Sequence, residues 1–247
     1  MGKEGNAMIG LGTIINTGAI LAGGLLGAVF GKYRKKNTQE GLTKACGVST
    51  LFVAVAGVME GMMTVQGTGL VSGGALLIIG CLAVGTLIGE LLKIEDAFER
   101  FGQWLKIKTG NAKDKGFVNA FVTASLTVCI GAMAIVGSIQ DGIQGDWSIL
   151  ATKAVLDLII IMVMTSSMGK GCAFSAIPIF AFEGSITLLS RLIAPFMTET
   201  AIENLSLIGS ILIFCVGINL VWGKKVRVAN MLPAVLLAIL AAYLPPL

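Results

Sequence analysis

The sequence contains no histidine, and only 13% of its 247 residues are charged. A soluble domain carries about 25% charged residues, so this chain has too little polar surface to cover a globule in water. The absence of histidine removes the commonest metal ligand and the commonest general base. Serine-hydrolase, nucleotide-binding and metalloprotease motifs are also missing. No residue pattern therefore supports an enzyme, and no cofactor or metal is expected.

The cysteines do not form a metal-binding or redox pattern. There are five, none of them in a CxxC spacing, and all lie in or at the edge of apolar segments. We interpret them as small packing residues rather than redox groups.

Apolar residues dominate what is present: 55% of the chain is hydrophobic and the mean hydropathy is +0.88. The apolar stretches are long enough to cross a hydrocarbon layer of roughly 30 Å. They are continuous, whereas the strands of a membrane β-barrel alternate in segments of about ten residues. The sequence therefore predicts an all-α fold, a polytopic bundle of helices in a lipid bilayer.

We expect about eight transmembrane helices in a single domain spanning 8–244. They are predicted at 8–30, 44–63, 70–92, 117–139, 149–168, 172–193, 201–222 and 228–244. The polar connector 93–116 contains an amphipathic segment, 94–107, that is typical of a helix lying at the membrane interface. A glycine-rich connection, 65–69, is expected between the second and third spans.

Basic residues gather on one side of this predicted topology. Of the 18 Lys and Arg residues, all but Lys3, Lys153 and Arg191 fall on the side of the loop 31–37. The positive-inside rule places that side in the cytoplasm and both termini outside. The net charge of +4 then reflects topology and contact with anionic lipid, and no nucleic-acid partner is expected.

The hydropathy pattern also suggests an internal repeat. When Thr43-Lys44-Ala45 is placed on Thr152-Lys153-Ala154, the three spans of 8–92 overlay those of 117–193. Units of three spans are inverted relative to each other, and the helices in 201–244 would be an addition. Inverted repeats are common in transporters, with the binding site at the repeat interface.

Lys153 and Asp157 lie four residues apart, so they share a helix face. One interpretation is a cation site whose carboxylate is released when an ion or proton arrives. The alternative is a neutralised pair that packs against another helix.

Glu183 is expected near the middle of its span, with no opposite charge within one turn. A carboxylate there is either protonated or faces a water-filled cavity. It is the strongest candidate for ion or proton coupling, and the alternative is a protonated side chain bonded to a neighbouring helix.

Further polar residues could complete a path for a cation. Hard cations such as Na⁺ prefer oxygen ligands. The candidates are Asn16 and Thr17 in the first span, Glu60 in the second, and Asn119, Ser125 and Asn219 in later spans. Each could instead form a hydrogen bond that holds two helices together. Asp141, at the outer end of the fourth span, could join Glu60 and Asp157 in an acidic vestibule that concentrates cations, but it is rather expected to reach the outer headgroups.

The segment 165–175 and the glycine-rich helix faces each have two interpretations. The segment 165–175, TSSMGKGCAFS, fits either a broken helix or a tight cytoplasmic turn with Lys170 at the surface. The glycine-rich faces Gly23-Gly24-Gly27 and Gly85-Gly89 could pack within one protomer or between protomers, so a homo-oligomer stays open.

Three segments together resemble a bacterial membrane family: GLGTIINTGAILAGGLLG at 10–27, GSIQDGIQGD at 137–146 and KAVLD at 153–157. The family is domain-of-unknown-function family 554, the YdfK/YqgA-like proteins, and the resemblance covers 8–244. It implies a multi-pass protein of the bacterial inner membrane, loosely described as a Na⁺ channel or pump, with one member associated with biofilm formation. It implies no particular catalytic or ligand residues.

The preferred hypothesis is a channel or secondary transporter for a small cation, Na⁺ or H⁺. Its site would comprise Glu183, Asp157, Lys153, Glu60, Asn16 and Thr17. The alternatives are a non-transporting signalling or scaffold protein of the membrane, and a transporter of a small organic solute.

Overall fold

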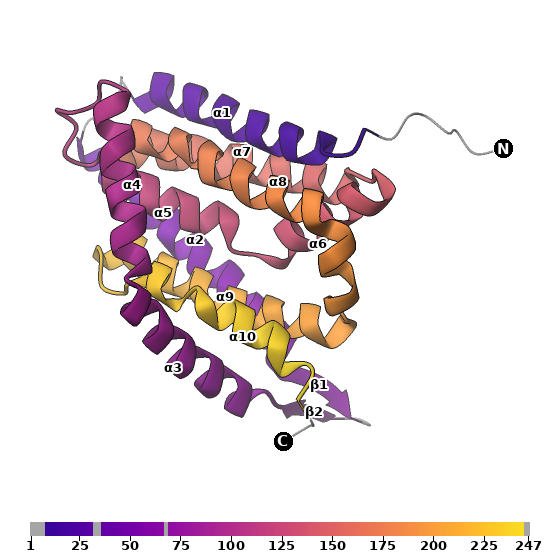
Figure 1. The fold of residues 1–247 in the computed structure, drawn as a ribbon. Helices are drawn as coiled ribbons and strands as arrows, with labels where there is room; N and C mark the ends of the chain where they lie inside the picture. Colours follow the sequence, from indigo (N-terminus) through magenta and orange to yellow (C-terminus); the bar gives the residue numbers. More distant parts are fainter. Residues whose placement is uncertain (1–7, 32–35, 67–68, 245–247) are drawn as a thin grey trace.

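The computed structural model describes residues 8–31, 36–66 and 69–244, which form a bundle of α-helices (Figure 1). In chain order the helices are α1 (Leu11–Gly31), α2 (Lys36–Met62), α3 (Ala75–Leu92), α4 (Ile94–Lys108), α5 (Phe117–Cys129), α6 (Ala132–Gln144), α7 (Ser148–Met168), α8 (Ala176–Ile193), α9 (Glu199–Trp222) and α10 (Pro233–Ala241). Short 3-10 helices are η1 (Lys170–Ser175), η2 (Ala194–Phe196) and η3 (Val228–Met231). The predicted all-α class is confirmed.

Within the described ranges, six helical segments are long and apolar enough to cross a membrane. They are α1, α2, α3, α7, α8 with its flanking 3-10 turns, and α9. The bent pair α5–α6 makes a seventh if it counts as one crossing, and η3 with α10 is a shorter apolar helix. Each of the eight predicted spans thus has a helical counterpart, but the fourth is not straight and the eighth is short.

The fourth predicted span, 117–139, is broken rather than continuous. α5 ends at Cys129, α6 begins at Ala132, and the two helices are bent by 62°. Between them Ile130 is extended and Gly131 has a positive φ of 156. The apolar run continues through the break, which is why hydropathy alone predicted one helix. The predicted repeat units 8–92 and 117–193 stay a prediction, and the straight α1 and the bent α5–α6 differ in shape.

A β-hairpin replaces the expected start of the third span. Strands β1 (Met63–Gln66) and β2 (Gly69–Ser72) pair antiparallel, with Thr64 opposite Val71. The third helix therefore begins at Ala75 and not at Leu70. Valine and threonine favour strands over helices. The first residues of the predicted third span therefore form strand β2, although they are part of an apolar run.

The segment 165–175 forms a tight turn between α7 and α8. α7 ends at Met168, Gly169 adopts a left-handed backbone with φ 109, and η1 leads directly into α8. Lys170 is exposed. Of the two sequence interpretations, the turn with a surface lysine describes the structure.

The bundle has two distinct ends (Figure 1). α4 and the turns around Gly169 and Gly223 lie at one end, and the β-hairpin and the start of α1 lie at the other. The predicted amphipathic segment forms α4, whose Leu105 is buried while Trp104 is exposed. We call these the α4 end and the hairpin end.

Glycines allow the closest helix contacts. A Cβ added to Gly23 of α1 would lie 2.4 Å from the carbonyl oxygen of Leu158 in α7. A Cβ at Gly89 of α3 would lie 1.8 Å from the carbonyl oxygen of Asn230. Small residues let membrane helices approach in this way. Both glycine-rich faces therefore pack within the protomer.

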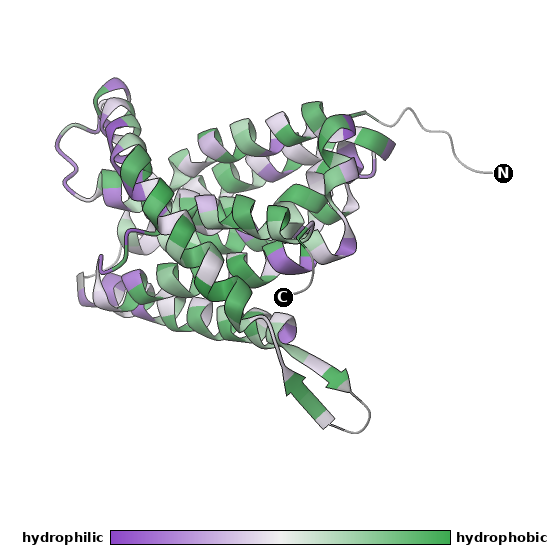
Figure 2. Cartoon of the chain, turned by 60° about the horizontal axis from the view of Figure 1, so that its bottom comes forward, coloured by the Kyte–Doolittle hydropathy of each residue, from purple (hydrophilic) through white to green (hydrophobic). Residues whose placement is uncertain are grey.

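Large apolar side chains also cover the outside of the bundle. Leu25, Leu91 and Leu188 are 71%, 75% and 84% exposed. Figure 2 shows hydrophobic residues along the lengths of the outer helices, and hydrophilic ones mostly at the two ends of the bundle. Such a surface fits hydrocarbon rather than water, and it identifies the chain as a membrane protein.

Candidate ion-binding site

Four of the six residues predicted for the site meet in the interior. Asn16 comes from α1, Lys153 and Asp157 from α7, and Glu183 from α8. All four are buried, and Asn16 and Glu183 have no exposed surface. We call this group the polar cluster. Its members lie far apart in sequence, so only the packing of α1 and α8 with α7 brings them together.

Hydrogen bonds and ion pairs connect the cluster. The Asn16 Nδ2 donates to Glu183 Oε1 at 2.8 Å. The Lys153 ammonium pairs with the Asp157 carboxylate and lies 3.9 Å from Glu183 Oε1. The predicted pairing within α7 is therefore present. Glu183, which has no opposite charge nearby in sequence, finds its cation on a different helix.

The break in the fourth span supplies a further hydrogen-bond acceptor to Lys153. Lys153 Nζ donates to the backbone carbonyl oxygen of Val128 at 2.8 Å. In a continuous helix that carbonyl would accept from the amide four residues later, but α5 ends at Cys129. Backbone groups freed inside a membrane must find a partner or line a cavity. Here a buried ammonium is the partner.

The cluster contains two carboxylates and one ammonium. If all three are ionised, one negative charge is unbalanced. An unbalanced charge buried away from water costs on the order of several kcal/mol. One monovalent cation or one proton would restore neutrality.

Two oxygen atoms of the cluster have no hydrogen-bond partner among the described residues, and Thr17, the next residue on α1, carries a third. Among the described residues, Asn16 Oδ1, Thr17 Oγ1 and Glu183 Oε2 are buried and have no hydrogen-bond partner. Buried polar atoms are normally satisfied. Carboxylate, amide and hydroxyl oxygens are the kind of ligand that a hard cation prefers.

The cluster lies in the half of the bundle nearer the hairpin end. Asn16 and Lys153 each come five residues after their helix begins, about 7.5 Å along a helix axis that rises 1.5 Å per residue. Glu183 lies further in, near the middle of α8. The position of Glu183 along α8 agrees with the prediction that it lies near the middle of its span, and the assignment of the hairpin end to the outer side stays a prediction.

A second polar contact lies one turn closer to the hairpin end. Thr13 and Thr187 hydroxyls are 3.3 Å apart. The Gly12 amide donates to Asp141 Oδ2 at 3.1 Å. Asp141 has no exposed surface, so the expectation that it reaches the headgroups is wrong. Ser138 and Asp141 share a helix face with small residues, which is the signal that could have placed Asp141 inside.

The remaining candidates lie elsewhere. Glu60 is exposed on α2 and makes no hydrogen bond or ion pair with any described residue. Asn119 is exposed on α5, and Ser125 donates to its own helix at the Phe121 carbonyl. Asn219 instead holds the turn after α9, where its side chain bonds Lys225 and Val226.

The similarity to known proteins covers almost all of the chain. A family model with the description "Protein of unknown function (DUF554)" matches residues 11–243. The chain is similar to the uncharacterized membrane protein YdfK of Bacillus subtilis (strain 168), with 28% identity over 226 residues, which cover 92% of this chain and 93% of the relative. It is 26% identical over 232 residues to the uncharacterized protein YqgA of Escherichia coli (strain K12), covering 92% and 94%. No solved structure matches the chain.

Proposed function

The chain belongs to the DUF554 family, and we propose that it transports a small monovalent cation, Na⁺ or H⁺, across the bacterial inner membrane as a channel or secondary transporter. The family description names no substrate, so the proposal rests on the side chains. The observation that carries it is the buried cluster in which two carboxylates, Asp157 and Glu183, share the single ammonium of Lys153.

Each residue of the cluster has a role in this proposal. Glu183 and Asp157 supply negative charge, and Lys153 is a tethered cation that competes with the transported ion for both. When an ion binds between the carboxylates, the Lys153 ammonium moves toward the Val128 carbonyl, which already accepts from it. In the absence of a bound ion, the Lys153 ammonium would thereby neutralise part of the negative charge of the two carboxylates.

Neutral oxygens complete the site. Asn16 holds Glu183 through its Nδ2 and leaves its Oδ1 free, and Thr17 adds a hydroxyl oxygen on the same helix. Interrupted helices at the binding site recur among secondary transporters, and the break after Cys129 lies beside this cluster. Glu60 has no place in the proposed site because it is exposed on α2.

Flux through purified protein in liposomes tests the proposal. We expect uptake of radioactive sodium, or collapse of an imposed pH gradient, to be faster with wild-type protein than with empty liposomes. Flux no greater than that of empty liposomes for both ions would contradict it. A flux of a small organic solute without cation movement would instead favour a solute transporter, and no flux of any kind would favour a signalling or scaffold role.

A further inference from the structure

A polar cavity of about 290 Å³ opens near the α4 end, away from the polar cluster. It lies between α4, α5, α9 and the turn that follows α9. Its lining residues include Glu95, Glu99 and Gln103 of α4, Lys115 just before α5, Asn119, Thr123 and Leu126 of α5, and Lys224 of the turn after α9, with valines of α5, α9, the turn and η3. The volume is close to the lower limit for small-molecule pockets, roughly 300 Å³.

The lining changes from charged to apolar with depth. Glu95, Glu99 and Lys224 lie where α4 meets the turn, and Leu126 and Val216 lie further along α5 and α9 toward the middle of the bundle. A polar entrance above an apolar constriction is typical of a water-filled vestibule that ends at a gate.

α5 connects the cavity to the polar cluster. Asn119, Thr123 and Leu126 share a face of α5 that lines the cavity. Val128, whose carbonyl accepts from Lys153, follows two residues later, about 3 Å further along the helix axis. The deep end of the cavity and the cluster therefore lie at similar depths, on either side of the end of α5.

Apolar side chains close the space between them. Leu126, Ile130 and Leu212 are buried in one hydrophobic cluster. Ile130, in the helix break, lies against α9, because a Cβ added to Gly209 would be 3.7 Å from Ile130 Cγ2. The break that frees the Val128 carbonyl thus also places the apolar Ile130 side chain against α9, in the same hydrophobic cluster as the cavity-lining Leu126.

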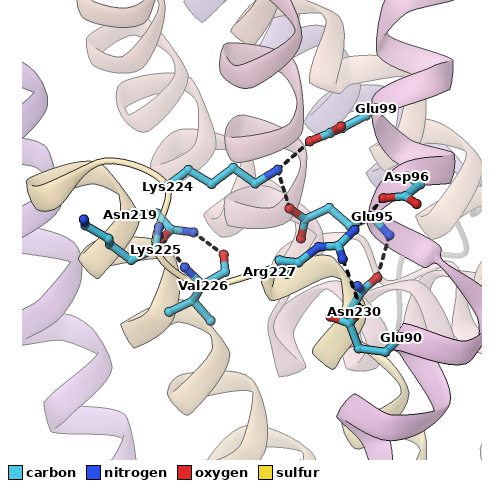
Figure 3. A network of polar contacts seen from close by, with 10 residues as sticks. All are labelled: Glu90, Glu95, Asp96, Glu99, Asn219, Lys224, Lys225, Val226, Arg227 and Asn230. Atoms are coloured by element: carbon cyan, nitrogen blue, oxygen red, sulfur yellow. Dashed lines mark hydrogen bonds and ion pairs between the residues drawn. The ribbon is translucent and has the colours of Figure 1, made fainter.

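Lys224 bridges the mouth of the cavity (Figure 3). Its ammonium lies 2.6 Å from Glu95 Oε1 and also pairs with Glu99. Burial lowers the pKa of Lys224, but hydrogen bonds and charges from the two glutamates outweigh burial and raise the pKa above its usual value. The lysine therefore stays charged at neutral pH. Glu95 is buried, and its Oε2 has no partner among the described residues.

The surroundings hold this bridge in place. Asn219 Oδ1 accepts from the amides of Lys225 and Val226 at 2.8 and 2.9 Å, which fixes the turn that carries Lys224. Asn230 Oδ1 accepts from the Glu95 amide at 2.7 Å at the start of α4. Arg227 joins the turn separately to Glu90 and Asp96, outside the cavity (Figure 3).

We infer that this cavity is the opening of the cation path at the α4 end, and that the bridge from Lys224 to Glu95 and Glu99 closes its mouth. The inference rests on the proposed cation transport and adds the route by which the ion reaches or leaves the polar cluster. When the bridge opens, the Glu95 and Glu99 carboxylates face an entrance that Lys115 also lines, and they supply oxygen ligands to an entering cation.

Charge-neutral substitution of adjacent lysines tests the bridge. Lys224→Gln should raise the initial cation flux about two- to fivefold, the change expected when the two partly exposed ion pairs of Lys224 that favour the closed mouth are lost. Lys225→Gln is the matched control, because Lys225 is exposed and has no ion pair among the described residues. Its flux should equal that of wild type. Equal flux in both variants would overturn the role of the bridge.

Cysteine modification tests the route itself and does not depend on the stability of Lys224→Gln. A charged methanethiosulfonate reagent should react with Thr123→Cys inside the cavity and abolish most of its flux. Lys108→Cys, exposed on α4 and outside the lining, should react without change in flux, and wild type reports the native cysteines. Thr123→Cys that reacts with full flux retained, or that fails to react, would overturn the inference. Wild-type protein without flux would overturn the proposed transport and the inference with it.

Discussion

Lys153 Nζ lies 3.9 Å from Glu183 Oε1, although the two residues belong to different helices and Lys153 already pairs with Asp157 on its own helix. One buried ammonium therefore serves two buried carboxylates. This shared cation is the basis of the proposed ion site. Its role can be measured in stability and in flux, and separate experiments test the helix packing and the orientation.

Removal of the shared cation should destabilise the protein. Lys153→Met leaves Asp157 and Glu183 buried without an internal positive charge, and breaking a buried pair typically costs about 3–5 kcal/mol. We expect the thermal unfolding temperature in detergent to fall. Added NaCl should raise it more for Lys153→Met than for wild type, because Na⁺ would take the place of the ammonium.

Choline chloride at the same concentration controls for ionic strength in that experiment. The double variant Lys153→Met with Asp157→Asn should regain part of the lost stability, since it removes one of the two unbalanced carboxylates. If sodium and choline stabilise every variant equally, Lys153 is a structural partner and not a competitor of a bound cation.

Two glycines of α1 should respond in opposite ways to the same substitution. Gly23→Ala places a methyl group against the Leu158 carbonyl, and such overpacking costs about 1–3 kcal/mol. At Gly18 no atom of the described residues lies within 4 Å of an added Cβ, so Gly18→Ala should keep or slightly raise stability, as alanine is the better helix former by about 1 kcal/mol. Thermal unfolding in detergent compares the two. Equal behaviour would contradict the close contact between α1 and α7.

Labelling in whole cells should establish the orientation. The α4 end carries most of the basic residues, so we expect it in the cytoplasm and both termini outside. Glu203→Cys, exposed on α9 near its start, should react with an impermeant thiol reagent in intact cells. Lys108→Cys should react only after the membrane is permeabilised. The reverse pattern would show the opposite orientation.

The sequence was sufficient to predict the helical membrane class and most of the polar cluster. Long continuous apolar runs are decisive for the class because a bilayer admits few other structures. Asn16, Lys153, Asp157 and Glu183 were identifiable because polar side chains are rare and costly inside membrane helices. The i,i+4 spacing also predicted the pairing of Lys153 with Asp157.

Other features depend on tertiary contacts that hydropathy does not register. The break at Ile130 and Gly131 lies within an apolar run. The meeting of Lys153 with Glu183, and of Asp141 with the Gly12 amide, depends on which helices pack together. Glu60 looked equivalent to these acids in sequence but lies on an exposed face of α2. The sequence thus shows that a charged residue lies within a span, where burial of its charge costs free energy. Only the packing of the helices shows which partner offsets that free energy.

The most direct test of the central claim is the cation flux of Glu183→Gln in liposomes, measured beside wild type and Glu203→Gln. Glutamine keeps an oxygen that can accept from Asn16 Nδ2 and removes only the charge. The account predicts that Glu183→Gln loses flux by at least about tenfold, equivalent to ~1.4 kcal/mol, while the exposed control Glu203→Gln matches wild type. Undiminished flux in a folded Glu183→Gln protein would contradict it.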